Sequence, residues 1–154
     1  MTFRTGARLG IDVGRARIGV ARCDPEGLLV SPVATLVRGK GDVAELARIA
    51  SENDILEIVV GLPLSLSGAR TASTDDAREF AAALGLATGL PVRLVDERLS
   101  TVSAQRSLHE AGRNTRSSRP VIDQVAATII LQHAIDAERS GGTPPGELII
   151  PIEG

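Results

Sequence analysis

Two short β patterns open the sequence: Arg8-Leu9-Gly10-Ile11-Asp12-Val13 in residues 8–13 and Arg17-Ile18-Gly19-Val20-Ala21-Arg22 in residues 17–22. The three residues between them, Gly14-Arg15-Ala16, are typical of a tight turn, so the two segments are predicted to pair as an antiparallel hairpin. Asp24-Pro25-Glu26-Gly27 is a second turn, and a third apolar segment covers residues 28–36. The opening of the chain therefore predicts three antiparallel strands.

Alternating helical and strand patterns follow these strands. Residues 56–62 and 91–95 are short apolar runs bounded by glycine and proline, which is typical of buried parallel strands. Asp42 is predicted to cap a helix, with Glu45 completing a capping-box-like pair. The later predicted helices cover residues 74–86, 100–111 and 120–139, with a loop over 113–119.

This element order, βββαβαβαα, predicts an α/β fold. Its mixed sheet is expected to hold five strands, three antiparallel and then parallel ones, flanked by helices. Residues 1–154 are predicted to form a single domain with a core over residues 8–139. Residues 140–154 read as a linker and an apolar tail, which is expected to dock on the domain because exposed aliphatic side chains are unfavourable.

The composition limits the functions open to this chain. Apolar residues make up 43% and charged residues 23%, the net charge is −2, and no apolar run reaches the length of a membrane span. Cys23 is the only cysteine, which excludes an intrachain disulfide and favours the cytoplasm; it is expected to be a small buried residue. With two Phe and no Tyr or Trp, the chain has few aromatic rings on which bases could stack, so nucleic acid is expected to be held through phosphates and shape.

Three acidic residues lie where predicted elements begin or end: Asp12, Glu97 and Asp123. Each lies among aliphatic residues, where a carboxylate is costly to bury unless it is paired or binds a metal. Carboxylates gathered in one place repel one another, and a divalent cation relieves that repulsion. The three residues are therefore predicted to be metal ligands of a phosphoryl-transfer site. Two Mg²⁺ or Mn²⁺ ions there would activate a water and stabilise the leaving oxygen.

Each acid also has a structural interpretation. An Asp before Gly, as at Asp12, commonly forms a turn, and Asp123 lies where a helix N-terminus favours negative charge. Asp96 and Glu97 are adjacent at a strand end, so only one is expected to enter the site. If Glu97 is the one that enters, Asp96 is expected to be a structural partner of Arg98 or of a backbone amide.

Four segments resemble the YqgF/RuvX family of the ribonuclease-H-like superfamily. The first joins Gly10-Ile11-Asp12-Val13-Gly14 to Arg17-Ile18-Gly19-Val20-Ala21; the others are Val59-Val60-Gly61-Leu62-Pro63-Leu64, Asp96-Glu97-Arg98-Leu99-Ser100-Thr101 and Asp123-Gln124-Val125-Ala126-Ala127. Any one of these motifs is weak, but four in the family's order across most of the chain are specific. Family members are described as pre-16S rRNA nucleases and as Holliday-junction-resolvase-like proteins. The resemblance implies a ribonuclease-H-like fold and selects Glu97 over Asp96 for the site.

Arginines are predicted to bind the nucleic acid. Arg113, Arg116 and Arg119 lie in a segment rich in Ser, Thr and Asn that is typical of a phosphate-binding loop, although a solvated loop has the same composition. The full set of predicted nucleic-acid-binding residues is Arg17, Arg70, Arg98, Arg113, Arg116 and Arg119.

The predicted function is a metal-dependent nuclease that processes the 5′ end of pre-16S ribosomal RNA. The alternatives are a Holliday-junction endonuclease, which needs two sites and hence a dimer, and an RNA-binding factor without catalysis. Structured nucleic acid, either pre-rRNA or branched DNA, is the expected partner of a monomer or homodimer, and no membrane partner is expected. A P-loop NTPase is excluded because the Gly-x-x-x-x-Gly-Lys-Ser/Thr motif is missing.

Overall fold

The first three strands form the predicted antiparallel meander. The computed structural model describes residues 3–99 and 119–149, and its chain opens with β1 (Ala7–Val13), β2 (Arg17–Cys23) and β3 (Val30–Val37). β1 pairs with β2 and β2 with β3, both antiparallel. At the first turn Gly14 N donates to Arg17 O, and a methyl group on Gly14 would lie 2.6 Å from that oxygen. The β1–β2 turn therefore needs glycine at this position.

The alternating part of the chain adds two parallel strands to the other side of β1. α1 (Asp42–Glu52) leads to β4 (Ile55–Leu62), and α2 (Ala72–Thr88) leads to β5 (Val92–Asp96). β4 pairs in parallel with β1, and β5 pairs in parallel with β4. The short helix η1 (Glu97–Leu99) follows β5, and the long helix α4 (Arg119–Gly141) begins after the gap in the described residues. The predicted helix over residues 100–111 and most of the predicted loop over 113–119 lie outside the described residues.

The sheet has six strands rather than the predicted five. The additional strand is β6 (Glu147–Ile149), which comes from the predicted tail and pairs antiparallel with β5, so that the order is β3-β2-β1-β4-β5-β6. Pairing with β5 gives the backbone groups of that strand partners that a free edge would lack. Arg78 of α2 also binds Glu147, with 2.7 Å between its nitrogen and the carboxylate oxygen. Residues 147–149 of the predicted tail are therefore docked as part of the sheet.

Two helix starts differ from the sequence prediction. α1 begins at Asp42, but Gly41 occupies its N-cap and no side chain caps the helix; Glu45 pairs with Arg48 instead of completing a capping box. α2 begins at Ala72, two residues before the predicted start, because Thr71 and Thr74 form a capping box there. Neither difference moves a predicted site residue.

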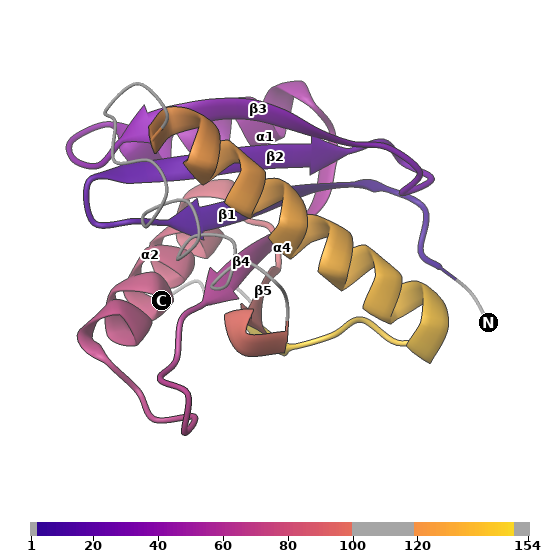
Figure 1. Cartoon of the computed structure of the whole chain (residues 1–154). Helices are drawn as coiled ribbons and strands as arrows, with labels where there is room; N and C mark the ends of the chain where they lie inside the picture. Colours follow the sequence, from indigo (N-terminus) through magenta and orange to yellow (C-terminus); the bar gives the residue numbers. More distant parts are fainter. Residues whose placement is uncertain (1–2, 100–118, 150–154) are drawn as a thin grey trace.

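Helices cover both faces of the sheet, as Figure 1 shows, with α1 and α2 on one face and α4 across the other. One apolar core lies under α1 and α2 and includes Leu9, Ile11, Ile58 and Val60. The other lies under α4 and includes Val59, Val95 and the helix residues Ala126, Ala127, Ile130, Leu131, Ala134 and Ile135. Alternation along β1 therefore places Gly10 and Asp12 on the face that α4 covers.

Glycines allow α4 to lie close to the sheet. A methyl group on Gly10 of β1 would lie 2.7 Å from Leu131 Cβ and 2.9 Å from Ala127 O, and one on Gly61 of β4 would lie 2.6 Å from Ile130 Cδ1. These distances are below ordinary van der Waals contact, so any side chain at these positions would push the helix away.

Gly10→Ala should therefore lower the free energy of unfolding by about 1–3 kcal/mol, as overpacked cores do. The control is Gly141→Ala in α4, where a methyl group would meet no atom within 4 Å. Urea unfolding of the two variants measures the difference. Equal stabilities would contradict the close approach of α4 to β1.

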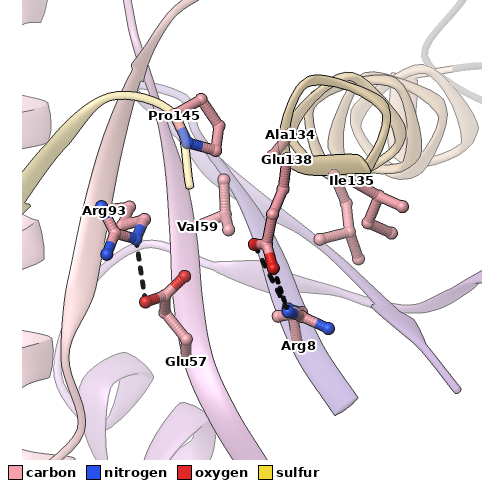
Figure 2. Close-up of a pocket in the computed structure, with 9 residues that line it drawn as sticks. Arg8, Glu57, Val59, Arg93, Ala134, Ile135, Glu138 and Pro145 are labelled. Atoms are coloured by element: carbon pink, nitrogen blue, oxygen red, sulfur yellow. Dashed lines mark hydrogen bonds and ion pairs between the residues drawn. The ribbon is translucent and has the colours of Figure 1, made fainter. Parts of the chain in front are cut away.

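A buried ion network fastens the C-terminal half of α4 to the sheet. Arg8 of β1 pairs with Glu138 of α4 at 3.1 Å, and both side chains are at most 4% exposed. Arg93 of β5 pairs with Glu57 of β4 at 2.9 Å, and Arg4 binds both glutamates. Figure 2 shows the two pairs side by side between the strands and the helix. The sheet face that α4 covers, called the α4 face below, therefore carries charged groups at this end. Its centre is lined by small and apolar residues.

Candidate functional site

The three predicted acids lie at the opposite end of the α4 face from the ion network. Asp12 is the second-last residue of β1, and Glu97 is the first residue after β5. Asp123 lies in the second turn of α4. The Asp12 and Glu97 residues are buried, at 1% and 6% exposure, and the side chain of Asp123 is 16% exposed. All three therefore come to the edge of the sheet where its parallel strands end, which is where open α/β sheets bind ligands.

Gly19 brings Asp12 and Asp123 together. Asp12 and Gly19 are directly paired across β1 and β2, so both point to the α4 face. A methyl group on Gly19 would collide with the backbone oxygen of Asp123. The helix turn that carries Asp123 therefore rests directly on the strand position beside Asp12.

Gly61 provides the corresponding space for Glu97. Ile11 pairs with Val60 in the parallel β1–β4 ladder, so one position further along Asp12 lies beside Gly61. A methyl group on Gly61 would lie 3.1 Å from Glu97 Cγ. The two strand positions that flank Asp12 are thus both glycines, and each is covered by one of the other two acidic residues.

The three acids share this region but do not form a closed set of ligands. Across residues 3–99 and 119–149, no group of three His, Cys, Asp or Glu side chains is close enough to hold one ion. Asp123 instead forms an ion pair with Arg17, with 3.0 Å between Arg17 Nε and Asp123 Oδ2. A predicted metal ligand and a predicted nucleic-acid-binding residue are therefore bound to each other.

Of the two adjacent acids, Asp96 has the structural partners that were predicted for it. Asp96 accepts hydrogen bonds from the backbone nitrogen and the guanidinium of Arg98, which confirms the predicted structural pairing. These hydrogen bonds from Arg98 hold the pKa of Asp96 below its ordinary value, against the opposing effect of burial. Arg98 also donates to the backbone oxygen of Leu66 and so contacts the loop after β4. Glu97 is the more buried acid of the pair.

Of the four other predicted nucleic-acid-binding arginines, the structure describes Arg70 and the backbone of Arg119. Arg70 is exposed and pairs with Asp75 at the start of α2. Arg119 is the first residue of α4 instead of the last residue of a loop. Arg113 and Arg116 lie outside the described residues.

Cys23 is buried in the core under α4, as expected, and burial raises the pKa of its thiol. In the described part of the chain, none of the helices is both long and apolar enough to cross a membrane.

Sequence reasoning missed two features of this face. The pair between Arg17 and Asp123 joins residues 106 positions apart, and no local pattern indicates it. The ion network does leave a signal in the sequence: Glu57 is a charged residue inside an otherwise apolar strand, which is rare unless the charge is paired.

Residues 6–137 match the sequence profile of a family described as "RuvX: Holliday junction resolvase". The chain belongs to the RuvX family. A relative from Clavibacter michiganensis subsp. michiganensis is 60% identical to this chain, and the aligned region covers 96% of this chain and 93% of the relative. Another from Leifsonia xyli subsp. xyli is 58% identical over 97% of each chain. Both are named "Putative pre-16S rRNA nuclease", and RuvX membership places this chain among nucleases, which hydrolyse ester bonds in nucleic acids.

A solved structure supports the same fold. RuvC from Thermus thermophilus, in complex with a Holliday junction substrate, superposes with a TM-score of 0.56 at 17% identity, covering 91% of this chain and 99% of its own. At this identity the likeness concerns the fold alone. The predicted ribonuclease-H-like architecture is confirmed, with six strands in place of five.

Proposed function

We propose that this chain is a divalent-metal-dependent nuclease that processes the 5′ end of pre-16S ribosomal RNA, with Asp12, Glu97 and Asp123 as its catalytic metal ligands. The observation that carries the proposal is the convergence of these acids around two glycines at one edge of the sheet. The substrate is inferred from the names of the two relatives described above, which are 60% and 58% identical to this chain.

The donor set suits a hard divalent cation. Carboxylate oxygens are the ligands that Mg²⁺ and Mn²⁺ prefer, and two of the three proposed ligands, Asp12 and Glu97, are held in buried positions. When bound, one or two such ions would supply an activated water and stabilise the leaving oxygen. The chain itself contributes the strand end at Asp12, the position of Asp123 on α4, and two glycines that let Asp123 and Glu97 approach the strand positions beside Asp12.

We further propose that the substrate is held by phosphate contacts from Arg17, Arg70, Arg98, Arg113, Arg116 and Arg119. The first three lie at or near the edge that carries the acids. The low aromatic content favours this mode over base stacking. We also propose that residues 1–154 form a single domain. The single cysteine favours a cytoplasmic location, which belongs to the same proposal.

The adjacent acids provide a matched test. Glu97→Gln should abolish cleavage of a structured RNA in Mn²⁺, because it removes a charged ligand while keeping the shape of the side chain. Asp96→Asn should keep most of the activity and should lower the melting temperature, since Asp96 pairs only with Arg98 among the described residues. Gel assays with a panel of structured RNAs and branched DNAs measure both variants. If the two phenotypes are exchanged, the assignment of Glu97 is wrong.

The second candidate function is junction cleavage in DNA. It is favoured by the description of the RuvX family and by the fold shared with RuvC. Cutting a junction symmetrically needs two sites related by a dyad, hence a dimer. The same panel distinguishes the candidates, because preferential cleavage of branched DNA by a dimer would replace ribosomal RNA as the substrate.

A further inference from the structure

The ion pair between Arg17 and Asp123 is the feature of this site that the nuclease mechanism does not use. Arg17 is the first residue of β2 and lies two positions before Gly19, so its side chain starts on the same sheet face as Asp12. Its guanidinium reaches Asp123 on α4 at 3.0 Å. The positive charge of Arg17 thus lies beside the proposed metal ligands and binds one of them.

The geometry of this ion pair would allow another cation to replace Arg17 as the partner of Asp123. Within the described residues, Arg17 makes one hydrogen bond to Asp123, from Nε, and its terminal nitrogens donate to no other residue. Arg38, by contrast, holds Asp76 with two parallel bonds of 2.8 and 3.0 Å. Bidentate pairs are the stronger kind. The side chains of Arg17 and Asp123 are 29% and 16% exposed, so solvent and ions can reach the pair.

We propose that Arg17 is a positioning residue that occupies Asp123 in the metal-free protein and releases it to an incoming divalent cation. This inference rests on the proposed function, because it takes Asp123 as a metal ligand. Without metal, Arg17 neutralises one of three neighbouring carboxylates and so limits their repulsion. The cation must compete with the guanidinium for Asp123, which lowers the apparent metal affinity. After the exchange, the guanidinium of Arg17 lies free at the edge where phosphates would bind.

Calorimetric titration of the whole chain with Mn²⁺, without nucleic acid, tests this directly. Arg17→Ala should bind Mn²⁺ about threefold to tenfold more tightly than the wild type, the range expected for a partly buried coupling. The gain should disappear in the Asp123→Asn background, because that substitution removes the carboxylate for which the cation and Arg17 compete. Arg17→Met, which keeps the length of the side chain, replaces Arg17→Ala if the alanine variant does not fold.

Arg22→Ala is the matched control, since Arg22 lies on the same strand but binds Asn53 at the other end of β2. Its Mn²⁺ affinity should equal that of the wild type. An increase as large as that of Arg17→Ala would show a general charge effect and overturn the inference. The inference would also be overturned if Arg17→Ala still raised the Mn²⁺ affinity in the Asp123→Asn background. It would fail as well if Arg17→Ala left the affinity unchanged while Asp12→Asn and Asp123→Asn each lowered it. Unchanged binding in both Asp variants would instead refute the proposed metal site itself.

Discussion

Asp12→Asn should lower the rate of RNA cleavage by more than about a hundredfold, since loss of even an outer partner of a metal ligand costs ten- to hundredfold. Asp12 is 1% exposed and lies between Gly19 and Gly61, the two positions covered by Asp123 and Glu97. The asparagine keeps the size of the side chain, so the fold should be retained. It also removes one of three neighbouring negative charges, so the melting temperature in EDTA should be unchanged or higher.

Single-turnover cleavage of a structured RNA in Mn²⁺ measures the first effect, and thermal unfolding in EDTA measures the second. Asp76→Asn is a suitable control, because Asp76 is a partly exposed aspartate that pairs with Arg38 on the opposite side of the sheet from α4. It should lose a little stability and no activity. An Asp12→Asn variant with wild-type turnover would remove Asp12 from the proposed site.

Glu138→Ala should destabilise the fold strongly, by about 3–5 kcal/mol, because it leaves the buried charge of Arg8 without its carboxylate. For a chain of 154 residues this corresponds to a fall in melting temperature of roughly 6–20 °C. Arg4, the other partner of Glu138, is more than a third exposed and contributes little to this loss. Glu79→Ala, at an exposed position in α2, should change the free energy of unfolding by no more than about 0.5 kcal/mol.

The same network should make stability depend on pH. Burial acts to raise the pKa of Glu138, but hydrogen bonds from Arg4 and the charge of Arg8 outweigh it, and the net shift is downward. A carboxyl whose pKa is lower in the folded state stabilises the fold above its unfolded pKa, and that contribution is lost as the pH falls through the folded value. The stability gap between wild type and Glu138→Ala should therefore be full near neutral pH and narrow in acid. A gap that stays constant down to about pH 2 would contradict the shift.

Local pattern was enough to predict β1 to β5 and the helices α1, α2 and α4, and it singled out the candidate acids. The turn at Gly14 defines the first hairpin, and Asp12 is conspicuous because it ends an apolar strand. The strand formed by residues 147–149 was not predicted, because three residues are too few to show a period and their partner is β5. The pair between Arg17 and Asp123 depends on how α4 crosses the sheet, which only the assembled fold defines.

The single helix α4 connects the acidic site at one end of the sheet face that it covers with the ion network at the other end. Asp123 and Glu138 are 15 positions apart on this helix, or about 22 Å at 1.5 Å per residue. A rotation of the helix by about 3° around its Glu138 end would displace its Asp123 end by roughly 1 Å, a misplacement that can cost about a hundredfold in rate. The ion network at Glu138 thus sets the orientation of α4 like the pivot of a lever. The position of Asp123 over Gly19 therefore depends on contacts at the far end of the helix.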